Sequence, residues 1–151
     1  MPDDRPMPVG RDMTYGQMRA ACYGVAGLTV ASALLPDDLM GVYSERSGTI
    51  LVDRRLTYTQ KRCVLAHELS HWRHGDEGCA GVASHLEESR ARRETALLLV
   101  DPVRLMVAET MYGNLWAIAA ELDVTLQVAS DYRSVIGGWT AHGLAGVETV
   151  G

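Results

Sequence analysis

The chain has 151 residues, which fits one typical domain and is too short for two. Hydrophobic residues make up 47% of the chain and charged residues 22%, a mixture that excludes wholesale disorder. The formal net charge of -5 argues against broad electrostatic binding to nucleic acid or to an anionic membrane.

The cysteines and one apolar segment indicate the cellular compartment in which the protein is expected. The chain has three cysteines at unrelated spacings: Cys22, Cys63 and Cys79. They form no CxxC pair and no disulfide framework, which favours a reducing compartment. The uncharged stretch 20–35 is short for a membrane span, contains two glycines and follows three aspartates, unlike a signal peptide. We therefore expect a cytoplasmic protein with no membrane partner.

The first third of the chain predicts a small sheet with a helix against it. Residues 1–12, rich in proline and aspartate, are predicted to be a flexible tail that precedes a single domain over 13–151. A first helix is expected over 15–25 and a buried strand over 28–30. The apolar runs 40–43 and 49–52 flank a polar stretch, as in an antiparallel hairpin.

Capping signals predict helices in the rest of the chain. Thr57 and Gln60 form a capping box that opens a helix to His74, and Gly75 supplies the left-handed residue after it. Ser84 and Glu87 form a second box, which opens a helix that ends near Val100. Asp101-Pro102 begins a third helix, and the last two are expected over 114–122 and 126–136. The predicted fold class is α+β, with a small antiparallel or mixed sheet packed on a mostly helical domain.

The helix expected after Thr57 contains His67-Glu68-Leu69-Ser70-His71, an HExxH motif. Two histidines four residues apart lie on one helix face, so both imidazoles can bind a single zinc ion. Glu68 is turned about 100° from His67, within reach of a zinc-bound water without binding the metal. Zinc lowers the pKa of that water to about 7, and a carboxylate can accept its proton. The motif therefore predicts metal-assisted hydrolysis.

A catalytic zinc needs three protein ligands and one open position. His74 lies about 10.5 Å along the helix axis from His67, too far to share one ion, so we expect it to complement the helix dipole. The remaining candidates are three glutamates of the next predicted helix and one cysteine: Glu87, Glu88, Glu94 and Cys79. Glu87 is expected to cap its helix, and Glu94 is expected to form an exposed ion pair with Arg90. Helical periodicity does not choose among the four.

The segment from Arg62 to His71, followed by Gly75-Asp76, resembles the ImmA/IrrE family of metallo-endopeptidases. The resemblance extends upstream to the predicted hairpin and downstream through Glu88-Ser89-Arg90-Ala91 to Asp101-Pro102, covering about residues 28–136. A strand pair, an HExxH helix and a following E-x-x-A helix are together far more specific than HExxH alone. The resemblance implies a zincin-like fold with HExxH on its central helix.

The resemblance also implies a site and a substrate. It assigns the third ligand to Glu88, so that His67, His71 and Glu88 hold one Zn²⁺ per chain. Glu68 would act as general base and then as general acid in peptide-bond hydrolysis. Family members cleave helix-turn-helix transcriptional repressors of phages or mobile elements, which would place a phage-encoded protein in the host cytoplasm. Four residues are candidates to stabilise the oxyanion: Tyr112, Tyr132, Arg133 and His142.

The alternative is a non-proteolytic zinc-containing regulator that binds a repressor or DNA through residues 115–136. These residues have the spacing of a helix-turn-helix. The second helix of the pair offers one basic residue, Arg133, and a cancelling Asp131, so we do not expect direct nucleic-acid binding. A purely structural zinc site also has no need of a general base such as Glu68.

Overall fold

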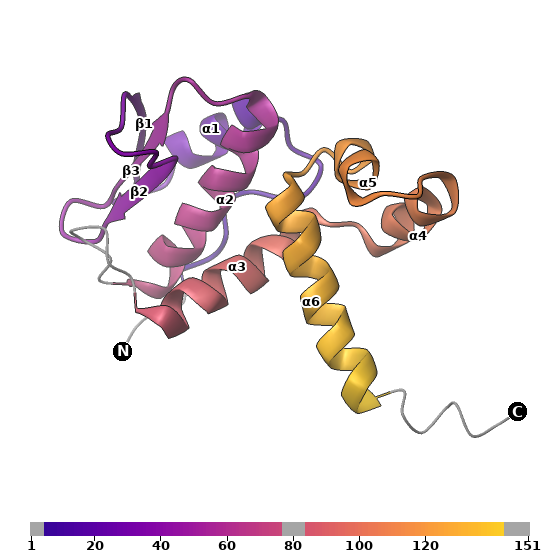
Figure 1. Cartoon of the computed structure of the whole chain (residues 1–151). Helices are drawn as coiled ribbons and strands as arrows, with labels where there is room; N and C mark the ends of the chain where they lie inside the picture. The colour runs from indigo at the N-terminus through magenta and orange to yellow at the C-terminus, as the bar shows by residue number, and fades with distance from the viewer. Residues whose placement is uncertain (1–4, 77–83, 144–151) are drawn as a thin grey trace, which may run out of the picture.

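A computed structural model describes residues 5–76 and 84–143, with side chains as far as residue 137 (Figure 1). A three-stranded sheet and α1 lie on one side of the long helix α2, and α3 to α6 lie on its other side. The elements follow in the order α1 (Tyr15–Tyr23), β1 (Thr29–Ala33), β2 (Gly41–Ser44), β3 (Thr49–Asp53), α2 (Tyr58–His74), α3 (His85–Leu99), α4 (Pro102–Met111), α5 (Leu115–Glu121) and α6 (Leu126–Gly143). The α+β class and the small mixed sheet predicted from the sequence are confirmed.

The sheet has the order β1-β3-β2, so β2 is an edge strand. β2 and β3 form the predicted antiparallel hairpin, with Tyr43 opposite Ile50. β1 pairs with β3 in parallel. β1 begins at Thr29 and is partly exposed, whereas the sequence predicted a buried strand there; only Leu28, just before it, is buried. Ile50 and Val52 of the central strand are fully buried, which fixes the sheet against the core.

Residues 5–12, predicted to be part of a flexible tail, pack against the domain. The Arg5 guanidinium donates hydrogen bonds to Glu45 and to the Trp72 carbonyl, and it lies over the Trp72 ring. Val9 is buried in the core. The buried Arg62 of α2 donates to the carbonyl oxygens of Arg11, Met13 and Asp123. Composition alone predicted a loose segment because it does not reveal these long-range partners.

The helix boundaries follow the capping signals closely. Thr57 and Gln60 form the predicted capping box, and Gly75 ends α2 with φ 62° in the left-handed region. Ser84 and Glu87 form the second box, and the Asp101 side chain accepts from the backbone N–H groups of Val103 and Arg104. The ends of α2, α3 and α4 are therefore set by local hydrogen bonds, and the residues that make these bonds can be recognised in the sequence.

The last helix, α6, ends later in the chain than predicted. α5 and α6 are joined at Asp123, which has φ 53°. α6 continues to Gly143, past the predicted end at Ile136, and its second half extends away from the body of the molecule (Figure 1). The first half of α6 packs on α3, with Val128, Ala129 and Tyr132 buried.

Gly41 of β2 lies in close contact with α2. A Cβ atom at this position would lie 2.4 Å from Val64 Cγ1 and 3.2 Å from Glu68 Cγ. The valine side chain is stiff at χ1 in a helix and cannot easily move aside. Only glycine therefore allows β2 to pack this closely over the HExxH segment.

We predict that Gly41→Ala lowers the free energy of unfolding by about 1–3 kcal/mol, because the added methyl overpacks the contact between β2 and α2. Gly10→Ala is the matched control, since a Cβ atom at Gly10 meets nothing within 4 Å. Urea unfolding measures both variants. Equal effects of the two substitutions would contradict the close contact.

Candidate metal centre

α2 presents both histidines of the HExxH motif on the face that packs against α3. His67 and His71 lie one turn apart with their ring centroids 5.0 Å apart. The His71 side chain is buried, and that of His67 is 20% exposed. The capping box at one end of α2 and the glycine at the other define the helix that holds the two rings in register.

α3 brings Glu88 to the two imidazoles. Glu88 Oε1 lies 2.8 Å from His67 Nε2, and Glu88 Oε2 lies 3.2 Å from His71 Nε2. The three ligand atoms all lie within 4.8 Å of one another. Bonds of about 2.1 Å place two ligands of a tetrahedral ion about 3.4 Å apart, so this donor set fits a single metal ion after small side-chain shifts.

The electrostatics of the group favour positive charge at the point where the three side chains meet. Hydrogen bonds from both histidines hold the pKa of Glu88 far below its ordinary value. Burial opposes the charged form of His71, but hydrogen bonds to Glu88 and Asp76 outweigh burial and raise its pKa to about 9. A cation bound between these side chains would take the place of that proton.

Asp76 and Arg90 form a second layer behind His71. Asp76 Oδ2 lies 2.8 Å from His71 Nδ1, and the Asp76 side chain is 5% exposed. The Nδ1–H group therefore donates to Asp76, which leaves Nε2 as the nitrogen that faces Glu88 and could bind a metal ion once it gives up its proton. Arg90 of α3 binds both carboxylate oxygens of Asp76. Sequence reasoning missed these roles, although a carboxylate directly after the helix-ending Gly75 was a usable signal.

Glu68 lies beneath β2, beside the candidate metal ligands. Its side chain is buried, with Gly41 directly above it. Burial raises the pKa of the Glu68 carboxyl, an effect that the neighbouring imidazoles of His67 and His71 oppose. A carboxyl group close to a candidate metal site but outside its ligand set can accept and return a proton.

The other candidates for the third ligand have different partners. Glu94 accepts from Ser70 Oγ at 2.5 Å and pairs with His74 Nε2 at 2.7 Å, so the predicted ion pair with Arg90 is wrong. Arg90 instead binds Asp76, because the partly buried side of α3 faces α2 and not solvent. Glu87 caps its helix as expected. Cys79 lies outside the described residues.

None of the described oxyanion candidates from the sequence lines the cavity that contains His67, Glu68 and Glu88. Tyr112 donates to Glu121, Tyr132 is buried, and Arg133 lies 3.7 Å from Glu109. The side chain of His142 lies outside the described part. Arg92, which sequence reasoning did not select, is the one lysine or arginine among the described residues that line the cavity next to the site.

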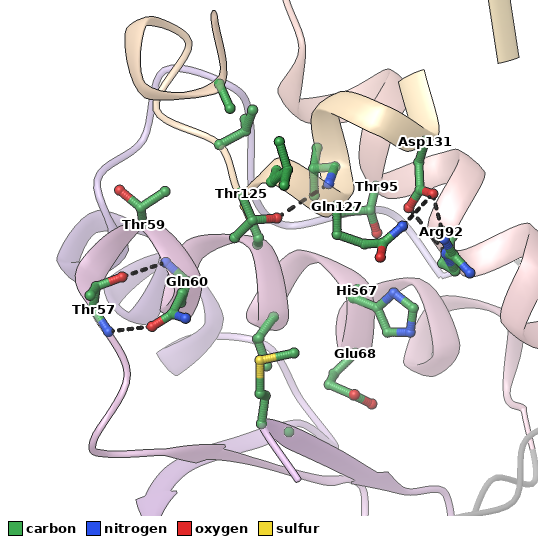
Figure 2. Close-up of a pocket in the computed structure, with 18 of the residues that line it drawn as sticks. Thr57, Thr59, Gln60, His67, Glu68, Arg92, Thr95, Thr125, Gln127 and Asp131 are labelled. Carbon is green, nitrogen blue, oxygen red and sulfur yellow. Dashed lines mark hydrogen bonds and ion pairs between the residues drawn. The ribbon is translucent and has the colours of Figure 1, made fainter. Parts of the chain in front are cut away.

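That cavity has a volume of about 890 Å³ and includes His67, Glu68 and Glu88 in its lining. Figure 2 shows His67 and Glu68 at one end and Thr57 and Gln60 at the other. The first two turns of α6 form another wall, where Arg92 of α3 makes two hydrogen bonds to Asp131 at 3.1 and 2.6 Å. The candidate catalytic groups thus open into a space large enough for several side chains.

Two helix-borne histidines, a glutamate between them and a second carboxylate from the next helix form an arrangement typical of metallopeptidases. The family model for peptidase family M78, the IrrE N-terminal-like domain, matches residues 28–131, more than half of the chain. The chain therefore belongs to this family of metallopeptidases, as the sequence resemblance predicted. No curated protein and no solved structure gives a significant match. No helix in the described part of the chain is long and apolar enough to cross a membrane.

We predict that Asp76→Asn weakens zinc affinity about 10- to 100-fold, because the amide no longer fixes the tautomer and orientation of His71. Competition with a chromophoric chelator measures the dissociation constant. Asp12→Asn is the control, since Asp12 is exposed and lies outside the site. Unchanged affinity in Asp76→Asn would show that His71 needs no orienting partner.

Proposed function

We propose that this protein is a zinc-dependent endopeptidase that cleaves a helix-turn-helix transcriptional repressor of a phage or mobile element. The observation that carries the proposal is the convergence of His67, His71 and Glu88 beside a buried Glu68. Membership of the M78 family supports peptidase chemistry. The resemblance to ImmA/IrrE peptidases supports the repressor as the substrate, which would place the reaction in the cytoplasm.

In this proposal His67, His71 and Glu88 would hold one Zn²⁺ ion, with Asp76 orienting His71 from behind. Zinc would supply a Lewis acid that polarises the scissile carbonyl and acidifies water. Two neutral imidazoles and one carboxylate are a ligand set found in catalytic zinc sites, which supports zinc over calcium or magnesium.

Glu68 would act first as general base and then as general acid. Its carboxylate would accept a proton from the attacking water and later return that proton to the leaving amine nitrogen. The raised pKa of Glu68 suits both steps, because the group must give up the proton as readily as it takes it. β2 covers this carboxyl at Gly41 and limits its access to bulk water.

The contacts of α6 weigh against the alternative in which residues 115–136 read DNA. A recognition helix must present free polar side chains to the base edges. In α6, Gln127 donates to Asp131, and Asp131 binds Arg92. Tyr132 is buried, and Arg133 faces Glu109. The side chains that would read DNA are therefore engaged within the protein.

We predict that Glu68→Gln lowers the rate of cleavage about 10²- to 10⁴-fold and leaves zinc content unchanged, because the amide cannot accept the proton and does not bind the metal. Zinc-loaded wild-type and variant proteins are incubated with labelled casein and with a panel of purified phage repressors, and cleavage is followed by mass spectrometry. Glu87→Gln, which alters a capping residue of α3, is the control.

The expected result for the wild type is a single cut in at least one repressor. Full activity in Glu68→Gln would disprove the general-base role. Cleavage of casein without any cleavage of repressors would support a peptidase and contradict the substrate class.

A further inference from the structure

The cavity beside the site is apolar along most of its length. Its apolar lining residues include Met40 and Val64, and the helices α5 and α6 add Ala119, Ala120 and Val128. Three large apolar side chains at its rim are strongly exposed: Leu39 at 43%, Met40 at 49% and Trp116 at 72%. An exposed group of large apolar side chains around a hollow is typical of a binding site.

Most polar side chains of the lining make hydrogen bonds within the protein, and the exposed Asp38 has Arg55 as a charged neighbour. Thr57 and Gln60 bond to each other's backbone in the capping box of α2, as the dashed lines in Figure 2 show. Thr59 donates to Asp123, and Thr95 donates to the Ala91 carbonyl. The walls away from His67 and Glu68 therefore offer few groups to a polar ligand and much surface to an apolar one.

The charged side chains of the lining also favour an apolar ligand. Arg92 is the single lysine or arginine in the described lining, and Asp131 binds its guanidinium side-on. Gln127 donates a further hydrogen bond to Asp131 at 2.9 Å. These bonds join α3, which carries Glu88, to α6, and so hold the α5–α6 wall beside the candidate metal ligands. An anionic ligand group would lose its hydration in the cavity without gaining an unpaired lysine or arginine among the described lining residues.

We propose that this cavity binds a large aliphatic or aromatic side chain of the peptide substrate, next to the bond to be cleaved. The inference deepens the proposed function and rests on it, because the ligand class follows from the continuity of the cavity with His67, Glu68 and Glu88. The small side chains of Ala119 and Ala120 leave the volume that the substrate side chain fills. Trp116 and Met40 then cover that side chain at the rim.

The test selects ligands without requiring turnover. A random heptapeptide display library is selected on zinc-loaded Glu68→Gln protein, and the peptides obtained are sequenced and synthesised. We expect a leucine, methionine or aromatic residue at one fixed position of the selected peptides. No enrichment, or enrichment of charged or small residues alone, would overturn the proposal.

Two variants in the same background locate the bound side chain. Ala120→Trp fills the cavity from an exposed position of α5 and is expected to weaken binding of the synthetic peptide about tenfold or more. Ala117→Trp is the matched control, because Ala117 lies on the same helix and does not line the cavity. Trp116→Ala, which removes an exposed side chain, provides a second weakened variant. Thermal unfolding verifies that all three variants are folded.

Equal binding by Ala120→Trp and Ala117→Trp would place the peptide elsewhere and overturn the proposal. The selected peptides are also incubated with zinc-loaded wild type. Binding in the cavity without cleavage would count against the proposed peptidase function and leave the inference about the cavity supported, so the two failures are distinguishable.

Discussion

The contact between α2 and α3 at Glu88 is the interaction on which the rest of the site depends. A single carboxylate lies between the Nε2 atoms of His67 and His71, and its two oxygens contact one imidazole each. Asp76 and Arg90 hold the same junction from behind, because Asp76 binds the far side of His71 and Arg90 belongs to α3. Gathering carboxylates at one place is costly unless positive charge compensates them, and a metal ion bound between His67, His71 and Glu88 would supply that compensation.

α3 joins the two halves of the molecule. Its Glu88 faces α2, and its Arg92, one turn later, faces α6. The turn between these two residues therefore sets the distance from the candidate ligands to the α5–α6 wall of the cavity. Deeper in the interface, Glu94 joins Ser70 and His74 of α2. Helix α3 thus carries the candidate ligand Glu88, positions one wall of the cavity and packs on the core, which accounts for its unusually charged sequence.

The sequence predicted what depends on local chemistry. Capping residues such as Thr57 and Ser84 bond to backbone three residues away, so their effect is visible in a short window. The partner of Glu94 was mispredicted because periodicity does not show which side of α3 faces α2. The bond between Arg92 and Asp131 joins residues 39 positions apart, and no local pattern indicates it. The cavity was missed for the same reason, since its walls come from distant segments.

The zinc content of the purified protein decides whether His67, His71 and Glu88 form a metal site. Elemental analysis is performed on purified wild-type protein and on Glu88→Ala and Glu94→Ala, two substitutions in the same helix. The structure brings Glu88 to both imidazoles and gives Glu94 other partners. With His67, His71 and Glu88 as the ligands, we expect one zinc per chain in the wild type, loss of zinc in Glu88→Ala and retention in Glu94→Ala. Carefully prepared wild-type protein without zinc, or a Glu88→Ala protein that retains it, would contradict the proposed metal centre.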